Sequence, residues 1–559
     1  MARHQMQQST HSMLHLTGEH ISFRNLPDMT SLFLDFVHEF NRVRAFYSTI
    51  EPNRHALLRF VPTITSERYP RDLLADVLRE QNREFGSSPA TFDRIEQLRA
   101  PDTVAVVTGQ QAGLFSGPLY TILKALTAIK VSRDLRTHGI AAVPIFWIEC
   151  DDHDHAEVSQ TLVLDREGRL TPVVYPIASS LAGKPIKEVA LTEEIHHTID
   201  HLLGLLPTSE FMPQLEQQIR QSYTPATSMA VAFGKLLAHW LRDFDLVLLD
   251  PTDIRLKSQL ISLFSQAIQR TPTIIERLLE HTQRLTDAGY HAQLRIHDRL
   301  VPLFIEYEGK RSALVYEAGR FALKNGRAAF TEEELLRIAQ TQPERISPSV
   351  VLRPLVQDTL LPTLVYVGGP SEIAYFAQLT PLAALFERPA APIMMRASAT
   401  LVESRYSKLL QTYGLTFEDL FRGFDAVMTS IVETSLAGDA AAQFDQAQLS
   451  FERRLNELRH LVANVDATLV RAADTTKEKI LGHLNQLRTK FNEAQARKAE
   501  TIYRQIQRAF NTLYPTGELQ ERHLNVVHFL SRYGLGLLPQ VLDVLDAWPS
   551  DHVIIRISV

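Results

Sequence analysis

Residues 103–118 read Thr-Val-Ala-Val-Val-Thr-Gly-Gln-Gln-Ala-Gly-Leu-Phe-Ser-Gly-Pro, an apolar run followed by a loop with three glycines. The run from Thr103 to Thr108 is typical of a buried strand. Pro118 suits the first turn of a helix, which we expect to continue to Arg133, and Ser116 is a candidate cap for its N-terminus. A strand, a glycine-bearing loop and a helix in this order predict one α/β unit.

A second apolar strand follows Gly139, with the sequence Ala141-Ala-Val-Pro-Ile-Phe-Trp-Ile. The two strands and the helix between them predict a right-handed crossover between parallel neighbours. Three further apolar runs of strand length stand next to helical segments, and we assign them to the same sheet: 245–250, 363–369 and 392–396. The sequence therefore predicts an α/β fold with an open parallel sheet.

The segments around these strands differ in character. Residues 28–100 have apolar side chains at helical spacing and predict N-terminal helices. The intervals 165–240 and 256–345 are rich in polar turns and predict two insertions that cover the sheet, the second with a hairpin around Gly309. Residues 514–559 turn apolar again, and we expect them to pack back on the main body.

Residues 445–513 have the pattern of a coiled coil. They contain one glycine, Gly482, and no proline, and their apolar residues alternate four and three apart. The irregular stretch 474–479 either interrupts one helix or separates two antiparallel helices. The predicted parts of the chain are, in order, the N-terminal helices with the first half of the core (1–164), the first insertion (165–240), a core strand (241–255), the second insertion (256–345), the second half of the core (346–444), the coiled coil (445–513) and the returning C-terminal segment (514–559).

Composition and charge argue against several classes of protein. With 58 basic and 64 acidic residues the net charge is -6, which gives no uniform positive field for a nucleic-acid backbone. The single cysteine, Cys150, permits no intrachain disulfide, as expected in the reducing cytoplasm. No apolar run reaches the roughly 20 residues that a membrane span needs. We therefore expect a cytoplasmic protein with no nucleic-acid or membrane partner.

Three polar clusters follow predicted strands, at residues 109–117, 151–155 and 368–375. Ligands of an open parallel sheet bind outside the carboxyl ends of the strands. We therefore expect the three clusters to converge on one site.

The first cluster has the features of an anion site. Gly109 and Gly113 let backbone amides approach a ligand, and a helix that begins behind Ser116 favours a phosphate or a carboxylate. Gln110 and Gln111 add neutral donors and acceptors. The spacing is neither the dinucleotide-binding fingerprint nor a Walker loop. The alternative is a tight turn in which the glycines serve packing.

Three carboxylates and two imidazoles stand within five residues in the second cluster. Along an extended chain, Asp152 and Asp154 would share one side. His153 and His155 would share the other, so that one pair grips an amine or a metal while a histidine moves protons. Asp151 is a further binding candidate. The alternative is a solvated acidic turn.

The third cluster opens a predicted helix, and its first amides, at Gly368, Gly369 and Ser371, offer a second anion site. Glu372 and Tyr375 are three residues apart and share one helical face, which can point at a ligand. The alternative is a capping carboxylate and a packing aromatic ring.

Four further residues belong near these clusters. Arg353, Asp358 and Arg396 can supply charge at the same rim, although each can also be a surface or ion-pair residue. Cys150 directly precedes the second cluster and is a candidate nucleophile. Its acidic neighbours would raise the thiol pKa, so we favour a structural role.

Four stretches carry a family resemblance: Thr108-Gly-Gln-Gln-Ala-Gly-Leu-Phe-Ser-Gly-Pro-Leu-Tyr, Phe146-Trp-Ile-Glu-Cys-Asp-Asp-His-Asp, Leu352-Arg-Pro-Leu-Val-Gln-Asp-Thr-Leu-Leu-Pro and Tyr366-Val-Gly-Gly-Pro-Ser-Glu-Ile-Ala-Tyr. In order and spacing, across nearly the whole chain, they resemble the bacillithiol biosynthesis cysteine-adding enzymes. The late coiled coil and the stretch that begins at Arg532 strengthen the resemblance. The family pattern has Glu-Asp-His-Asp, where Asp151 stands first here.

The resemblance implies a Rossmann-like core with two connective insertions, related to class I aminoacyl-tRNA synthetases, and a coiled coil that forms a homodimer. It implies a ligase that adds cysteine to glucosaminyl malate in the last step of bacillithiol biosynthesis. Amide formation needs an activated carboxylate, so we expect ATP, used to form an adenylate. No His-x-Gly-His or Lys-Met-Ser-Lys-Ser signature is present. We predict that the loops at Gly109 and Gly368 bind anionic groups and that Asp152, His153 and Asp154 hold and deprotonate the amine.

Two other functions remain open at this point. The first keeps the fold but makes the protein a metal-dependent hydrolase that uses Asp152, His153 and His155. The second is a coiled-coil scaffold, without catalysis, whose α/β body binds a nucleotide. We assign no residue as a metal ligand from the sequence.

Overall fold

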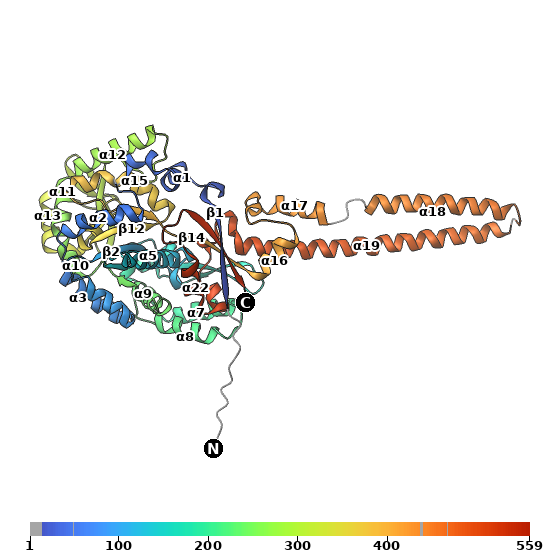
Figure 1. The fold of residues 1–559 in the computed structure, drawn as a ribbon, viewed down its shortest axis with the longest axis horizontal. Helices are drawn as coiled ribbons and strands as arrows, with labels where there is room; N and C mark the ends of the chain where they lie inside the picture. The colour runs from blue at the N-terminus through green and yellow to red at the C-terminus, as the bar shows by residue number, and fades with distance from the viewer. Residues whose placement is uncertain (1–13, 48–49, 436–439, 467, 559) are drawn as a thin grey trace, which may run out of the picture. The chain divides into compact units, whose positions relative to one another are not determined.

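The computed structural model describes residues 14–47, 50–435, 440–466 and 468–558 (Figure 1). The chain divides into two compact units. The first unit comprises residues 1–404 and 518–559, and the second comprises residues 405–517.

A parallel sheet forms the centre of the first unit, with the strand order β13-β12-β2-β3-β6. Its strands are β2 (Val104–Gln111), β3 (Ala142–Glu149), β6 (Val247–Leu249), β12 (Thr363–Gly368) and β13 (Ile393–Met395). Neighbouring strands are all parallel. Because helices cover both faces, these strands are almost continuously apolar and buried. The predicted sheet, with the three later apolar runs assigned to it, is confirmed.

Helix α5 (Leu119–Thr137) connects β2 to β3 and packs against both strands (Figure 1). Three details of the prediction are wrong. Strand β2 continues to Gln111, so Gly109 belongs to the strand and not to the loop, and α5 continues beyond Arg133. Ser116 does not cap the helix, because its backbone is left-handed (φ 80°) and the cap position falls on Pro118.

Helices precede the central sheet, as predicted. They are α1 (Ser31–His38), α2 (Arg54–Ser66), α3 (Arg71–Phe85) and α4 (Pro89–Gln97). Helix α2 packs against β12 and β2, whereas α3 packs against β6. The strand before them, β1 (His15–Ser22), was not predicted.

The segment after β3 forms the first covering region. A short helix α6 (His155–Val158) leads into a hairpin of β4 (Gln160–Leu164) and β5 (Leu170–Val174). Three helices follow: α7 (Glu194–Leu205), α8 (Met212–Ser222) and α9 (Met229–Trp240). Helix α9 packs against α3 and α8, so its apolar faces are buried on two sides.

The segment after β6 contains an antiparallel sheet with the strand order β10-β9-β8-β7-β11. Its elements are α10 (Ile254–Gln259), α11 (Ile261–Gln269), α12 (Thr271–Asp287), β7 (Leu300–Tyr307), β8 (Lys310–Glu317), β9 (Arg320–Leu323), β10 (Ala329–Phe330), α13 (Glu332–Thr341) and β11 (Ile346–Pro348). The predicted hairpin around Gly309 is confirmed as the turn between β7 and β8. Helices α14 (Arg353–Leu360) and α15 (Pro370–Leu385) then flank β12.

The C-terminal segment returns to the first unit, as predicted. It contains α20 (Gln520–His523), α21 (Val527–Tyr533), α22 (Leu537–Val544) and β15 (Asp551–Ser558). Strand β15 lies between β1 and β14 (Ser398–Glu403), antiparallel to the first and parallel to the second. Segments from both ends of the chain thus form one small sheet.

The second unit contains α16 (Ser404–Thr412), α17 (Phe424–Ser435), α18 (Ala440–Ala463) and α19 (Leu469–Leu513). Side-chain pairs Asp445 to Arg488 and Arg459 to Asp474 show that α18 and α19 are antiparallel. Of the two interpretations left open, the antiparallel hairpin is therefore correct. The stretch 474–479 is not the point of separation, however, because α18 ends at Ala463, α19 begins at Leu469 and 474–479 is continuous helix within α19. No described helix combines the length and apolar character that crossing a membrane requires.

Candidate active site

A cavity of 630 Å³ lies at the carboxyl ends of β2, β3 and β12. Its walls bring together predicted residues from all three polar clusters and two of the charged residues added to them: Gly109, Gln110, Gln111, Asp152, His153, Arg353, Gly369, Ser371, Glu372, Tyr375 and Arg396. The cavity also contains residues that the sequence did not single out, chiefly Lys124, Glu149, Phe304, Arg311, Tyr366 and Arg522.

The end of β2 is packed too closely for any residue but glycine at position 109. A Cβ atom on Gly109 would lie 2.8 Å from the carbonyl oxygen of Trp147 and 3.0 Å from Nη2 of Arg353. This close approach brings the guanidinium of Arg353 to 5.0 Å from the ring centroids of both Trp147 and Tyr366. Gly109 therefore serves to place Arg353 in the cavity wall.

Arg353 is paired with a carboxylate at the end of β3. Its Nε donates to Oε2 of Glu149 over 3.3 Å, and the indole nitrogen of Trp147 donates to the same oxygen over 3.2 Å. Burial raises the pKa of Glu149, although the charge of Arg353 opposes that rise. The pair thus places a cation and a carboxyl group side by side in the wall.

Asp152 and His153 face the cavity just beyond β3. The amide of Gln111 donates to Oδ2 of Asp152 over 2.5 Å, and the backbone N–H of His153 donates to Oδ1 over 2.7 Å. Burial opposes ionisation of Asp152, but the hydrogen bonds from His153 and Gln111 outweigh it and hold the pKa well below its usual value. Asp152 is therefore an anion at neutral pH, with an imidazole beside it.

Arg311 reaches the same place from the hairpin of the second insertion. Its guanidinium carbon lies 3.6 Å from the ring centroid of Phe304, and Nη1 lies 3.1 Å from Nδ1 of His153. Nη1 is also 3.5 Å from Oδ1 of Asp152, while Nη2 donates to the carbonyl of Pro348 over 2.9 Å. These contacts fix a second arginine against the Asp152 and His153 pair.

The carboxylate of Glu372, in the first turn of α15, caps the N-terminus of its own helix. Glu372 accepts hydrogen bonds from the backbone N–H of Gly369 over 2.7 Å and from the hydroxyl of Tyr366 over 2.6 Å. Nζ of Lys124 lies 2.5 Å from Glu372 and donates to the carbonyl oxygen of Gly109 over 2.8 Å. Burial opposes ionisation of Glu372, but Lys124 outweighs it and lowers the pKa of this carboxyl. Glu372 is therefore a capping carboxylate, and it also lines the cavity together with Tyr375.

Comparison with known protein families gives two matches that together span most of the chain. The family description "Bacillithiol biosynthesis BshC, N-terminal Rossmann-like domain" matches residues 16–397. The description "Bacillithiol biosynthesis BshC, C-terminal coiled-coil domain" matches residues 399–557. The chain belongs to the BshC family.

Curated relatives agree with this assignment over nearly their whole lengths, and carry the name "Putative cysteine ligase BshC". The protein of Koribacter versatilis is 34% identical over 537 residues, which cover 96% of this chain and 99% of the relative. That of Salinibacter ruber is 34% identical over 527 residues, covering 94% and 96%. That of Geobacillus kaustophilus is 31% identical over 539 residues, covering 95% and 98%.

In this BshC-family chain, Asp151 lies outside the cavity and forms a buried ion pair. Nζ of Lys257 is 2.5 Å from Oδ2 of Asp151, and Nζ of Lys187 is 4.0 Å from Oδ1. Burial opposes ionisation, but Lys257 and Lys187 outweigh it and lower the pKa of Asp151. Lys257 also donates to the carbonyl of Ile346 over 3.2 Å. The structure thus gives Asp151 a role in tying β3 to α10 and β11.

Asp154 and His155 also turn away from the cavity. Asp154 is exposed, and its carboxylate accepts from the backbone N–H of Glu157 over 3.2 Å, which caps α6. Nε2 of His155 is 2.8 Å from the carbonyl oxygen of Lys184. The expected alternation is wrong, because helix α6 begins at His155 and ends the extended run.

The loop before α5 is held in a strained form by distant residues. Phe115 and Ser116 both have positive φ angles, of 51° and 80°. The backbone N–H of Phe115 donates to the hydroxyl of Tyr223 over 2.9 Å, and the side-chain amide of Asn525 donates to its carbonyl over 2.7 Å. Gly113 lines a second cavity of 230 Å³, which shares Gln110, Gln111, Tyr120, Glu157 and Arg522 with the first. Ser116 lines neither cavity.

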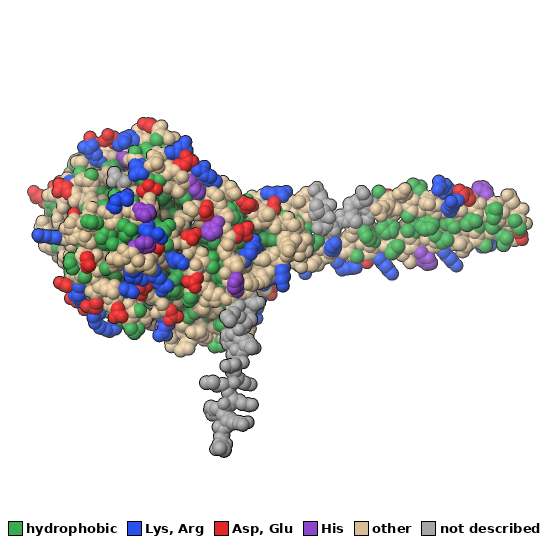
Figure 2. Space-filling model, in the orientation of Figure 1, with side chains coloured by type: hydrophobic (Ala, Val, Ile, Leu, Met, Phe, Trp, Pro, Cys, Tyr) green, Lys and Arg blue, Asp and Glu red, His purple; other side chains and the backbone are tan. Residues whose placement is uncertain are grey.

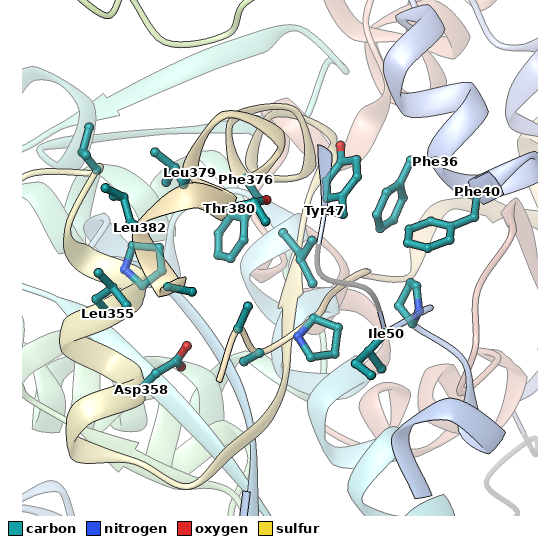
Figure 3. A pocket seen from close by; sticks show the side chains of 18 residues that line it. Phe36, Phe40, Tyr47, Ile50, Leu355, Asp358, Phe376, Leu379, Thr380 and Leu382 are labelled. Carbon is teal, nitrogen blue, oxygen red and sulfur yellow. The ribbon is translucent and has the colours of Figure 1, made fainter. Parts of the chain in front are cut away.

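Asp358 lies in a separate, largely apolar pocket of 50 Å³, among Phe36, Tyr47, Leu355 and Leu379 (Figure 3). The expectation that it shares the rim with Arg353 is wrong. Both residues are on α14, but five positions separate them, which turns their side chains about 140° apart around the helix axis. Burial raises the pKa of Asp358 to about 7.

Gly368 and Cys150 have packing roles. A Cβ atom on Gly368 would lie 2.8 Å from Cδ1 of Ile393, and the carbonyl of Gly368 accepts from the backbone N–H of Arg396. Cys150 is buried, its thiol donates to Asp250 over 2.9 Å, and burial raises its pKa. Among the residues that the structure describes, no group of three or more His, Cys, Asp and Glu side chains is arranged to hold a metal ion.

Proposed function

We propose that this chain joins the carboxyl group of cysteine to the amino group of glucosaminyl malate, and so forms the amide of the last step of bacillithiol biosynthesis. Its membership of the BshC family and the cysteine ligase name of its relatives support this reaction class. Both substrates carry amino and carboxylate groups, so their site needs anions and cations in one enclosure. The 630 Å³ cavity has both.

The observation that carries the proposal is the placement of Asp152 and His153 together at the carboxyl end of β3. The carboxylate of Asp152, anionic at neutral pH, can hold the ammonium form of the sugar amine. His153, beside it and partly exposed, can accept the proton that the amine must lose before it attacks a carbonyl carbon. Arg311, which contacts both, orients this pair and compensates its charge.

Amide formation from a free carboxylate also needs a leaving group, and we propose that ATP supplies it. The residues present fit a phosphate-bearing group. Arg396 and Arg522 lie in the cavity wall, and the N-terminus of α5 opens into the adjoining 230 Å³ cavity. The buried hydroxyl of Thr121, in the first turn of α5, has no hydrogen-bond partner among the described residues and lines that second cavity.

We further propose that the hairpin of α18 and α19 pairs with a second copy of the chain. Figure 2 shows a band of apolar side chains along the hairpin, and the exposed apolar residues of this region include Leu449, Leu458, Leu461 and Leu487. Exposed apolar patches of this extent mark protein interfaces. A homodimer through the hairpin would remove them from water.

The decisive experiment incubates the purified chain with cysteine, glucosaminyl malate and ATP and follows the product by mass spectrometry. The proposal predicts a product whose mass is the sum of the two substrates less one water. Parallel reactions omit ATP or include a chelator. Product without ATP would overturn the role of ATP, and hydrolysis of glucosaminyl malate that stops on chelation would favour the metal-dependent hydrolase instead.

A further inference from the structure

The segment that follows the coiled coil contributes to the wall of the active-site cavity. Within the short helix α20, the side chain of Arg522 lines the cavity, while that of the preceding residue, Glu521, points into the protein interior. Glu521 is 2% exposed, so its carboxylate has no access to water that would offset the cost of burying its charge.

Three donors from one short stretch of chain surround the Glu521 carboxylate. Oε1 accepts from Nη2 of Arg396 over 2.7 Å and from the hydroxyl of Ser398 over 2.9 Å. Oε2 accepts from the backbone N–H of Ala399 over 2.7 Å. Burial opposes ionisation of Glu521, but Arg396 outweighs it and lowers the pKa of the carboxyl. The structure therefore contains a buried ion pair between the side chain of Glu521, in the C-terminal segment, and an arginine of the cavity wall.

Arg396 is held in one orientation by this pair. Its Nη1 donates to the carbonyl of Ala397 over 2.8 Å, and its guanidinium carbon lies 5.5 Å from the ring centroid of Tyr120. Arg396 is itself 4% exposed and lines the cavity. Because Glu521 and Ala397 accept from its two terminal nitrogens, the guanidinium is held beside Tyr120 in the cavity wall.

A neutral histidine completes the surroundings of the pair. His552, on β15, lies 2.8 Å from the hydroxyl of Ser398 through Nδ1 and 2.9 Å from that of Thr400 through Nε2. Burial lowers the pKa of His552 to about 4, so it carries no charge at neutral pH. Arg396 is therefore the cation that balances Glu521.

We infer that Glu521 is a positioning residue of this site: it fixes the Arg396 guanidinium so that it meets a carboxylate or phosphate group of a substrate in a preset orientation. The inference rests on the proposed function only in that the cavity binds an anionic substrate. It assigns the C-terminal segment two tasks, since Arg522 lines the wall and Glu521 aligns the arginine beside it. A planar guanidinium is well suited to this use, because its donors match carboxylate and phosphate groups in pairs.

The test compares Glu521→Gln with a matched control, Glu403→Gln. Glu403 is another buried carboxylate, at the end of β14, paired with Arg532 and Tyr533, and it does not line the cavity. Glutamine keeps the shape of Glu521 but removes the charge and turns an amide toward Arg396. We expect Glu521→Gln to lower kcat/KM for one of the anionic substrates by up to about 100-fold. A small displacement of a binding group produces losses of this size. Glu403→Gln should keep the wild-type KM values.

The KM values of cysteine, glucosaminyl malate and ATP, each varied alone, identify which anionic group Arg396 meets. A double-mutant cycle then asks whether Glu521 acts through Arg396. If it does, Glu521→Gln combined with Arg396→Lys is no worse than Arg396→Lys alone, and Glu521→Asp restores part of the loss. The inference is overturned if the losses in kcat/KM of Glu521→Gln and Arg396→Lys multiply in the double variant. It is also overturned if Glu521→Gln and Glu403→Gln lose equal activity, in proportion to the fall in their thermal midpoints.

Calorimetric binding of ATP and of malate separates this inference from the proposed function. These titrations need no turnover, so they remain informative if the ligase assay yields no product. Weaker binding of one probe to Glu521→Gln than to Glu403→Gln supports the positioning role. Equal binding to both variants, or no binding of either probe to the wild-type chain, counts against it.

Discussion

Replacing Asp358 by asparagine should stabilise the protein, by an amount that grows with pH. The Asp358 carboxyl lies in the apolar pocket of Figure 3, and burial raises its pKa from 3.8 to about 7. A carboxyl whose pKa is higher in the folded state binds its proton more tightly there, so folding stability falls as the pH rises from 3.8 through 7. Asparagine removes that loss, because it has no proton to release.

The size of the effect follows from the two pKa values. With a folded pKa of about 7 and an unfolded pKa of 3.8, ionisation costs about 1.7 kcal/mol at pH 5 and about 4 kcal/mol at pH 8. These are upper values, because the Asp358 side chain is not completely buried. Asparagine can still accept the hydrogen bond that Gln357 donates to Asp358 over 3.2 Å.

Thermal unfolding of the wild type and of Asp358→Asn, measured from pH 5 to pH 8, checks this prediction. Asp151→Asn is the control, since Asp151 is a buried aspartate whose pKa is shifted the other way by Lys257. It should be less stable than the wild type by an amount that hardly changes over this range, because both its pKa values lie below pH 5. A constant difference between Asp358→Asn and the wild type across the range would refute a raised pKa for Asp358.

Three further predictions concern the cavity and the hairpin. His153→Ala should lower kcat/KM by about 10²- to 10⁴-fold, the usual contribution of a proton-transfer group, whereas Asp154→Asn should retain near wild-type kinetics, because Asp154 is exposed and caps α6. Gly109→Ala should reduce both activity and thermal stability, since its Cβ would meet the backbone at 2.8 Å. Gly482→Ala, on an open face of α19, should instead stabilise by up to about 1 kcal/mol. Leu458→Glu should halve the mass measured by light scattering if the exposed apolar band pairs two chains; an unchanged mass would contradict that pairing.

The strands of the central sheet could be predicted because their signal is local. Runs such as 103–108 are apolar on both faces, and a fully buried parallel strand requires that composition. Knowing that the strands are parallel also places their carboxyl ends together, so the meeting of Gln111, Asp152 and Glu372 followed from topology alone.

The orientation of single side chains could not be predicted in the same way. Asp154 turns outward because α6 begins one residue later, and Asp358 turns from the cavity because α14 rotates it away from Arg353. Both outcomes depend on where a helix begins or how far it turns. The pattern of residue types at 151–155 is the same for an extended chain and for a helix that begins within it.

Residues from distant segments were missed for a different reason. Arg311 comes from a hairpin of the second insertion and Arg522 from the segment after the coiled coil. Each is one arginine among many in its segment, and nothing in the neighbouring sequence marks it. Only the fold, which closes loops of more than 100 residues, shows that they share a cavity with Asp152.

Each of the cations that line the cavity is paired with a carboxylate. Arg311 lies 3.5 Å from Asp152, Arg353 3.3 Å from Glu149, Lys124 2.5 Å from Glu372, Arg396 2.7 Å from Glu521 and Arg522 2.8 Å from Glu518. A buried charge without a partner is costly, so this pairing lets the four buried cations, all but the half-exposed Arg522, stand in one wall. It also fixes their directions before any substrate arrives. Charged groups that are already paired and oriented can meet substrate groups of either sign without first reorganising.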